Sequence, residues 1–304
     1  MSARWKAMAI ACCLALLSGC SVLSPAPSRP PGPPSVEPEP EPTPPRVLKA
    51  PKVALALGGG AARGFAHIGV VQVLEENGIK VDLVAGTSAG SLVAALYASG
   101  KSGQEMAKLA ETMDEGAITD WSFPLKGLIK GEALARYVRQ QTGGKTIEQL
   151  PVPLGIVATN LHDGSGVLFR SGDLGQAVRA SSAVPAVFQP VEIGARTFVD
   201  GGLVAPVPVR YARQMGAEVV IAIDISSPPD PKTKTDPFNM LMQTVAIMGR
   251  SINSSELREA EVVIRPDLTG VASSDFSARK QAIAAGRAAA QALLPRLKAA
   301  VAPR

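Results

Sequence analysis

The sequence is poor in cysteine and histidine. Its three cysteines, Cys12, Cys13 and Cys20, all lie near the start, so residues 21–304 have none and form no internal disulfide. Whatever domain follows is therefore held together by packing alone. The two histidines are His67 and His162, and no cluster of metal-ligand residues is visible. We therefore expect no bound metal.

Aromatic residues and a strong charge of one sign are also missing. Aromatic residues make up 4% of the chain, and 31 lysines and arginines against 26 acidic residues leave a net charge of +5. The cations are scattered, without a basic stripe interleaved with aromatic side chains, so we expect no nucleic-acid partner. A mild attraction to anionic lipid stays open. The 46% of hydrophobic residues and the length suit one large domain.

The N-terminus combines two cations with a short apolar run. Arg4 and Lys6 precede AMAIACCLALLSG, which is too short to span a membrane and is typical of a signal peptide. The run ends in LSGC, which resembles the bacterial lipobox and implies a signal peptide at 1–19 and lipidation of Cys20. The alternative is a coincidental cysteine. By similarity to other lipoproteins, Ser21 favours an outer-membrane protein of the bacterial cell envelope that faces the periplasm.

Proline dominates the next segment, SVLSPAPSRPPGPPSVEPEPEPTPP. Proline fixes φ and donates no amide hydrogen bond, so this stretch builds neither helix nor sheet. At about 3.1 Å per residue, roughly 25 residues reach at most about 80 Å. We interpret residues 20–46 as the lipidated cysteine with a tether, and 47–304 as the folded domain. A leader without a role would have the same composition.

Strand and helix patterns alternate along the rest of the chain. This alternation predicts a layered α/β fold with a mostly parallel sheet. Expected strands are 52–57, 81–86, 153–161, 197–200 and 218–226, and expected helices are 67–78, 88–100, 173–184, 238–260 and 275–300, with VVIRP (262–266) between the last two.

The motif GTSAG follows one expected strand and opens a helix. Gly86, Ser88 and Gly90 fit Gly-x-Ser-x-Gly, which can hold a nucleophilic serine on a sharp strand-to-helix turn. The alternative is an ordinary N-cap. A nucleophilic serine needs a base, which is usually a histidine.

A second glycine-bearing turn, GGGAARG (58–64), links the first expected strand and helix. It is not a Walker A loop because Phe65 follows Gly64, and not a dinucleotide fingerprint because Arg63 replaces a glycine. What remains is a loop of unobstructed amides at a positive helix end, which can stabilise an oxyanion. Arg63 would hold the loop in shape or meet an anionic head group. The alternative is a plain tight turn.

A third element, FVDGG, places Asp200 at a strand end before Gly201 and Gly202. Asp-Gly is often an ordinary turn. A carboxylate beside glycines that allow close approach can instead accept a proton from a serine.

Together the three motifs resemble those of the patatin-like phospholipase family. The resemblance covers about residues 50–270, includes the stretches GFAHIGV and AVRASSAVPAVFQPV, and is closest to bacterial members and the catalytic domain of neuropathy target esterase. It implies a patatin-like fold with helices on both faces of the sheet. The matching positions are Gly58, Gly60, Arg63 and Gly64 in the oxyanion loop, Gly86, Ser88 and Gly90 in the elbow, and Asp200, Gly201 and Gly202.

The resemblance also implies a Ser-Asp dyad without histidine and without metal or organic cofactor. Ser88 would attack an ester carbonyl, and Asp200 would take its proton and return it to the leaving alcohol. The oxyanion hole would be Gly58, Gly59 and Gly60, with the amides of the last two holding the charge. We expect burial to raise the pKa of Asp200. The expected substrate is a phospholipid or lysophospholipid.

Two other functions and several residues stay open. The chain could instead transfer the acyl group to another alcohol, or be a non-catalytic lipid-binding lipoprotein. The oligomeric state is open. We expect His67 to be structural, His162 and Asp163 to lie in a solvated turn, and Asp82 to be a turn or strand-edge residue. We expect the methionine-rich stretch 238–248 to be core, with an acyl-pocket wall or a lid as the alternative.

Overall fold

The computed structural model describes residues 32, 48–114, 120 and 129–304. The predicted signal peptide, Cys20 and, apart from Gly32, the predicted tether lie outside these residues. Residues 47–304 form one compact unit, which carries all three motifs.

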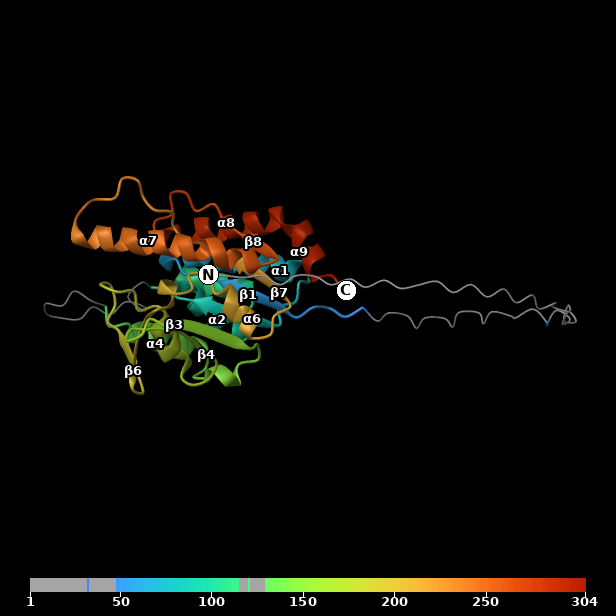
Figure 1. The fold of residues 1–304 in the computed structure, drawn as a ribbon, viewed down its shortest axis with the longest axis horizontal. Helices are drawn as coiled ribbons and strands as arrows, with labels where there is room; N and C mark the ends of the chain where they lie inside the picture. Colours follow the sequence, from blue (N-terminus) through green and yellow to red (C-terminus); the bar gives the residue numbers. More distant parts are fainter. Residues whose placement is uncertain (1–31, 33–47, 115–119, 121–128) are drawn as a thin grey trace, which may run out of the picture. The chain divides into compact units, whose positions relative to one another are not determined.

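An eight-stranded, mostly parallel sheet forms the centre of this unit, in the order β5-β6-β3-β2-β1-β7-β8, with β4 paired to β3 (Figure 1). The strands β3, β2, β1, β7 and β8 are parallel to one another, whereas β4 and β6 pair with β3 in the antiparallel direction. The predicted α/β fold is confirmed. The strands are β1 (Val53–Leu57), β2 (Leu83–Thr87), β3 (Leu154–Asn160), β4 (Gly166–Phe169), β5 (Val191–Ile193), β6 (Arg196–Asp200), β7 (Val219–Ile223) and β8 (Val262–Ile264).

Helices cover both faces of the sheet, because the central strand β1 carries apolar side chains on both of its faces. Because side chains alternate along a strand, Val53, Leu55 and Leu57 face one cluster and Ala54 and Ala56 face another. The first cluster includes α1 (Phe65–Glu76), α2 (Ala89–Ala98) and α8 (Arg279–Ala292), and the second includes α6 (Val209–Gln214). Both faces of β1 are buried, as expected of a central parallel strand.

The last expected helix is two helices, α8 and α9 (Leu294–Val301), with Pro295 in the first turn of α9. Proline lacks the amide that would continue the hydrogen bonding of α8, so the chain breaks there. Close contact fixes α8 against α1. A Cβ at Gly69 would lie 2.0 Å from the Ile283 carbonyl oxygen, and one at Gly286 would lie 2.0 Å from that of Ala66.

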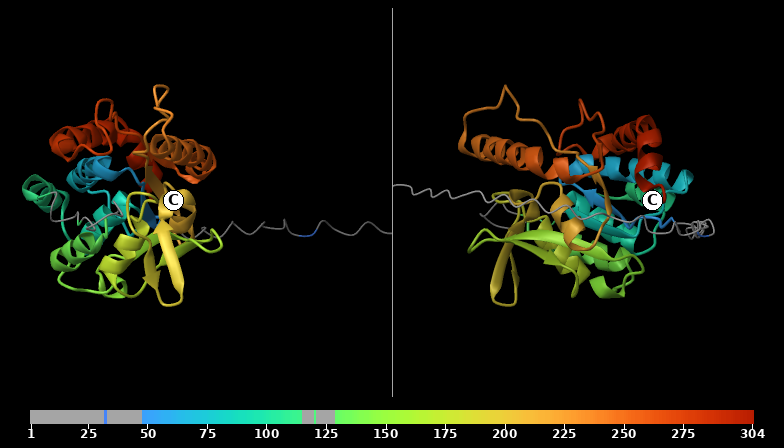
Figure 2. Two further views of the ribbon diagram at one scale, coloured as in Figure 1. Left: turned by 90° about the vertical axis from the view of Figure 1, so that its left-hand side faces the viewer. Right: turned by 45° about the vertical axis from the view of Figure 1, so that its right-hand side comes forward.

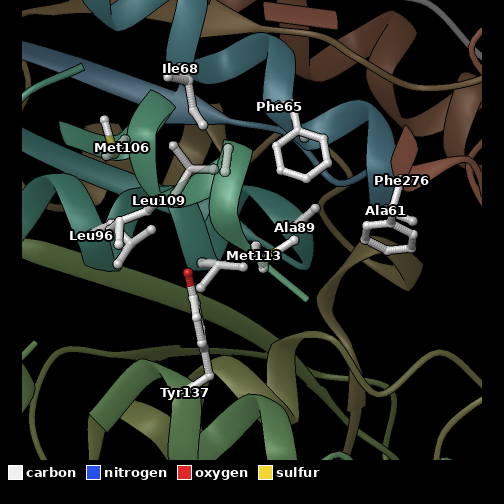
Figure 3. A pocket seen from close by; sticks show the side chains of 14 residues that line it. Ala61, Phe65, Ile68, Ala89, Leu96, Met106, Leu109, Met113, Tyr137 and Phe276 are labelled. Carbon is white, nitrogen blue, oxygen red and sulfur yellow. The ribbon is translucent and has the colours of Figure 1, made fainter. Parts of the chain in front are cut away.

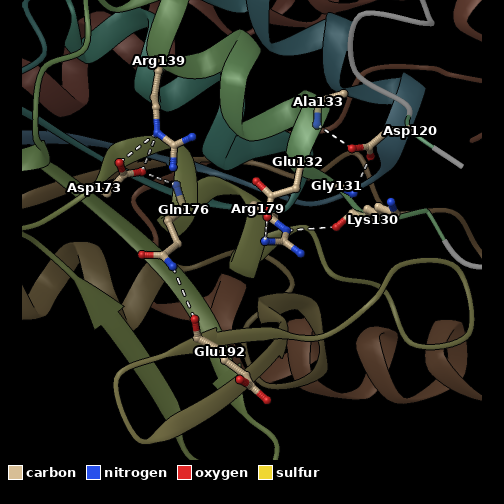
Figure 4. Close-up of polar contacts among 10 residues, drawn as sticks. All are labelled: Asp120, Lys130, Gly131, Glu132, Ala133, Arg139, Asp173, Gln176, Arg179 and Glu192. Atoms are coloured by element: carbon tan, nitrogen blue, oxygen red, sulfur yellow. Dashed lines mark hydrogen bonds and ion pairs between the residues drawn. The ribbon is translucent and has the colours of Figure 1, made fainter. Parts of the chain in front are cut away.

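Two neighbouring helices, α4 and α5, are joined by ion pairs (Figure 4). Arg139 of α4 (Glu132–Gln141) contacts Asp173, the N-cap of α5 (Leu174–Ser181), at 2.9 Å. Arg179 of α5 pairs with Glu132 of α4. The sequence patterns did not predict α4, nor α3 (Gly103–Thr112), α6, β4 and β5.

The prediction that residues 238–248 are core is wrong. They belong to α7 (Pro237–Glu256), which lies along the outside of the unit (Figure 2). Among the described residues seven large apolar side chains are exposed, and five of them are on α7. At the end of the helix, buried Glu256 pairs with Arg210, and nearer its start Gln243 hydrogen-bonds to the backbone of Asp230. The five exposed side chains are Phe238, Met240, Leu241, Ile247 and Met248.

None of the helices in the described part of the chain is long and apolar enough to cross a membrane.

Candidate active site

Ser88 occupies a strained turn between β2 and α2. Its φ of 52° and ψ of −125° lie outside the regions that non-glycine residues favour. Such a conformation costs about 1–3 kcal/mol and persists only where the surroundings enforce it. This is the backbone geometry of a nucleophile elbow, so the motif forms the turn that the sequence predicted. Ser88 is 9% exposed.

The glycines on either side of Ser88 are required by close backbone approach. A Cβ at Gly90 would lie 2.1 Å from the carbonyl oxygen of Leu57, and one at Gly86 would lie 2.6 Å from that of Gly90. Both obstacles are main-chain atoms, which cannot rotate away. Gly90 therefore allows the elbow to sit directly against β1, and Gly86 allows the chain to turn closely onto the start of α2.

Side chains from distant segments hold the elbow in place. The amide of Ser88 donates to Ser181 Oγ at 2.8 Å, and this hydroxyl donates to the Val157 carbonyl at 2.6 Å. Thr87 Oγ1 donates to the Ala205 carbonyl at 2.8 Å. The sequence analysis did not assign a role to Ser181. The available signal was its place in the family-like stretch AVRASSAVPAVFQPV.

Asp200 ends β6 and is 6% exposed. Its Oδ1 accepts the Gly202 amide at 2.6 Å, whereas its Oδ2 has no regular hydrogen bond among the described residues. Gly201 is needed because a Cβ there would lie 2.1 Å from the Val157 carbonyl oxygen. The Asp-Gly-Gly motif thus places a buried carboxylate with one oxygen free to take a proton.

Burial raises the pKa of Asp200 from 3.8 to about 6, and interactions with the Ser88 side chain and the Gly202 amide lower it in part. The Ser88 side chain is therefore close enough to affect the pKa of Asp200, although no hydrogen bond of regular geometry joins the two side chains. Catalytic hydrogen bonds are often long before substrate binds. A carboxylate with a pKa near 6 is a stronger base than an ordinary aspartate and is still ionised at neutral pH.

The glycine loop lies against Ser88, but only part of it has a free amide. A Cβ at Gly59 would lie 3.2 Å from Ser88 Cβ. The Gly58 amide donates to the Ile223 carbonyl at 3.1 Å and the Gly59 amide to the Pro206 carbonyl at 2.9 Å. These two amides are therefore already occupied, which corrects the predicted oxyanion hole in this conformation. Of the three glycines, Gly60 alone keeps an amide with no hydrogen-bond partner among the described residues.

The buried side chain of Arg63 helps to hold the glycine loop in place. It is 8% exposed, and its Nη1 donates to Ser227 Oγ at 2.5 Å. Burial lowers the pKa of this guanidinium, and the charge of Asp224 opposes that shift. The side chain therefore ties the short helix Ala61–Gly64 to the segment after β7, which favours its loop-holding role. Gly64 permits contact with Ala89, whose Cβ would be 2.9 Å away from a Cβ at Gly64.

His67 also supports the loop. It is fully buried, and its Nε2 donates to the Gly58 carbonyl at 2.8 Å. Burial lowers its pKa to about 4, so the ring is neutral at neutral pH. His162 and Asp163 lie in an exposed turn, and Asp82 accepts the Val53 amide at 2.9 Å at a strand edge.

An apolar pocket opens next to the elbow (Figure 3). It reaches from Ala89, the residue after Ser88, between α1, α2, α3 and α4. None of its lining atoms comes from the methionines of α7. Its larger lining side chains include Phe65, Leu96, Met106, Met113, Tyr137 and Phe276.

A family model described as patatin-like phospholipase matches residues 55–213, which is more than half of the chain and includes all three motifs. This chain belongs to the patatin-like phospholipase family.

Individual relatives agree with this assignment. The chain is 39% identical over 184 residues to the NTE family protein Rv1063c of Mycobacterium tuberculosis, covering 60% of this chain and 51% of the relative. It is 38% identical over 191 residues to patatin-like phospholipase domain-containing protein 6 of Homo sapiens, covering 60% of this chain and 14% of that protein. The chain therefore spans about half or less of the length of these relatives.

A solved structure shares the fold. VipD from Legionella pneumophila superimposes with a TM-score of 0.56 over 83% of this chain and 67% of its own, at 15% sequence identity. At that identity the similarity concerns the fold alone.

Proposed function

We propose that this chain is a serine acyl-ester hydrolase of the phospholipase A or lysophospholipase type, with Ser88 as nucleophile and Asp200 as base. The observation that carries the proposal is Ser88 on a strained elbow, close enough to interact with a buried carboxylate whose pKa is raised to about 6. Family membership supports the same chemistry. His67 is not suited to be the base of Ser88, because its Nε2 donates to the Gly58 carbonyl and burial lowers its pKa to about 4, which makes it a weak base.

The reaction begins when ionised Asp200 takes the hydroxyl proton of Ser88 as Oγ bonds to the ester carbonyl carbon. The carbonyl oxygen becomes an anion, which the amides of Gly60 and Ala89 stabilise at the start of α2. Protonated Asp200 then gives its proton to the leaving alkoxide oxygen as the C–O bond breaks. This leaves an acyl-serine and a free alcohol.

The second half repeats these steps with water. Asp200 takes a proton from water, the hydroxide attacks the acyl carbon, and the returning proton restores the Ser88 hydroxyl as the fatty acid leaves. The apolar pocket beside Ala89, of about 60 Å³, would hold the first carbons of the acyl chain, since its lining is formed by hydrocarbon and aromatic side chains. This supports a lipid ester as the substrate, and the exposed apolar side chains of α7 suit a protein that works at a lipid surface.

Covalent labelling tests this function. A fluorophosphonate should react with Ser88 of residues 47–304, and mass spectrometry should locate the adduct on that residue. Only ionised Asp200 accepts a proton, so the labelling rate should rise about tenfold per pH unit below about pH 6 and level off above it. A flat profile between pH 5 and 7 would exclude Asp200 as the base.

The same preparation separates the alternative functions. Products formed with an added alcohol acceptor distinguish transacylation from hydrolysis. Tight lipid binding without Ser88 labelling or turnover would favour a non-catalytic lipid-binding protein instead.

We further propose that Cys20 is lipidated and tethers the domain to the outer membrane, facing the periplasm. The support is the charged start, the short apolar run and the LSGC sequence. Cells grown with radiolabelled palmitate should label the wild-type protein and Cys13→Ser but not Cys20→Ser. Label retained in Cys20→Ser would contradict this proposal.

A further inference from the structure

A second pocket, of about 440 Å³, lies at the carboxyl end of β7, away from the apolar pocket. Its walls come from the segment after β7, the C-terminal half of α7, and the residue that follows β8. In parallel α/β sheets, ligands commonly bind outside the carboxyl ends of the strands. Its polar lining is Asp224, Ser226, Ser227, Arg250, Asn253, Ser254 and Arg265.

Asn253 is the feature that points to a ligand. Its side chain is 4% exposed, yet neither its amide nitrogen nor its amide oxygen has a hydrogen-bond partner among the described residues. Buried amides are almost always hydrogen-bonded, because leaving them unpaired is costly. A helix that buries such a side chain in a pocket wall offers a donor and an acceptor to whatever fills the pocket.

The charges in this pocket favour a singly charged anion. Asp224 is already engaged, since its Oδ1 accepts from Ser226 at 2.6 Å and its Oδ2 contacts Arg265 at 3.3 Å. Arg250 is exposed and makes no ion pair or hydrogen bond with any described residue. Two arginines against one aspartate leave the pocket with one positive charge.

The pocket is connected to the catalytic loop from two sides. Ser227, in its wall, accepts the hydrogen bond from Arg63 that braces the loop. Gly249, next to Arg250, lies against Pro206, whose carbonyl accepts the amide of Gly59. The walls of the pocket therefore contact residues that hydrogen-bond to the glycine loop or belong to it.

We propose that this pocket binds the phosphodiester head group of a phospholipid substrate, with Arg250 and the Asn253 amide as its donors. The proposal rests on the proposed hydrolase function for its place in catalysis. The phosphodiester carries one negative charge, which matches the pocket, and guanidinium groups bind phosphate oxygens through paired N–H donors. The ester carbonyl would then lie at Ser88 and the start of the acyl chain in the apolar pocket.

The proposal is tested by comparing the hydrolysis of two substrates that carry the same single acyl chain, one with a phosphodiester and one without. Arg250→Ala should lower kcat/KM for palmitoyl lysophosphatidylcholine about tenfold, mainly through KM, because it removes a charged hydrogen-bond donor. Hydrolysis of monopalmitoylglycerol, which lacks phosphate, should be unchanged. Arg258→Ala, an exposed cation just past the end of α7 and outside the pocket, should affect neither substrate. An equal loss on both substrates, or no loss on either, overturns the proposal.

A binding experiment separates this proposal from the hydrolase function. Titration of the Ser88→Ala protein with glycerophosphocholine, followed by calorimetry, should show binding that Arg250→Ala and Asn253→Asp each abolish, with both variants folded by circular dichroism. Inorganic phosphate should bind at least tenfold more weakly. Equal binding of inorganic phosphate identifies a free-phosphate site and overturns a head-group role, as does no binding of glycerophosphocholine. If glycerophosphocholine binds but the wild type turns over no ester, the head-group pocket is supported and the hydrolase function is contradicted.

Discussion

Replacing Ser88 with alanine is expected to lower ester turnover by about 10⁴-fold or more, because the acyl-enzyme can no longer form. Asp200→Asn is expected to lower kcat by about 10²–10⁴-fold, since an amide accepts no proton. Both would be measured as release of fatty acid from lysophospholipid by purified residues 47–304. Ser99→Ala and Asp163→Asn are the matched controls, because both side chains lie away from the dyad and make only local hydrogen bonds.

The stability of Asp200→Asn shows whether its loss of activity comes from the missing base or from an unfolded protein. The folded pKa of Asp200, about 6, is above its ordinary value of 3.8, so folding favours the protonated form. The associated stabilisation is present below about pH 4 and is lost as pH rises through about 6. At neutral pH the buried charge therefore opposes folding, and Asp200→Asn should unfold at the same denaturant concentration as wild type or a higher one. An active Asp200→Asn enzyme would exclude the dyad.

Gly90→Ala is expected to destabilise the folded domain strongly. Its Cβ would lie 2.1 Å from the Leu57 carbonyl oxygen and 2.6 Å from the Leu57 carbonyl carbon. These atoms belong to the central strand β1, so the elbow or the strand must move. Overpacking in a well-packed core costs about 1–3 kcal/mol and sometimes more. We expect a loss of about 3 kcal/mol or more in the free energy of unfolding, with loss of Ser88 labelling.

Gly249→Ala is the matched control for this substitution. It lies inside α7, and its Cβ would meet Pro206 Cγ at an ordinary 3.5 Å. Alanine favours the helix over glycine by about 1 kcal/mol, so this variant should be as stable as wild type or more stable. Urea denaturation followed by circular dichroism compares the two. Equal stability of Gly90→Ala and wild type would show that β1 and the elbow do not pack as described.

Local sequence patterns were sufficient to predict the buried central strands and the helices that pack on them. The strand at 53–57 and the helix after the glycine loop follow from apolar periodicity and glycine punctuation, which are local properties. Elements with weaker patterns were missed. The amphipathic helix α3 has a capping box at Ser102 and Glu105 that marks its start, yet the sequence analysis passed over it. Strands β4 and β5 are short and partly exposed, so their patterns are weak.

The apolar composition of α7 gave the wrong prediction that its first half is part of the core. The stretch from Phe238 to Met248 has the residues of a core helix, and composition alone cannot show whether another element covers it. In the folded chain no described element covers Met240, Ile247 or Met248, so they are exposed.

The sequence by itself determined the alternation of strands and helices, the Gly-x-Ser-x-Gly elbow, the glycine loop and the Asp-Gly-Gly motif, because each depends on residues within a few positions of one another. The tertiary structure decided which amides remain free, since that of Gly59 is occupied by Pro206. It also decided that Ser181, 93 residues away, holds Ser88, and that burial raises the pKa of Asp200. These features arise from contacts between distant segments, which no local pattern encodes.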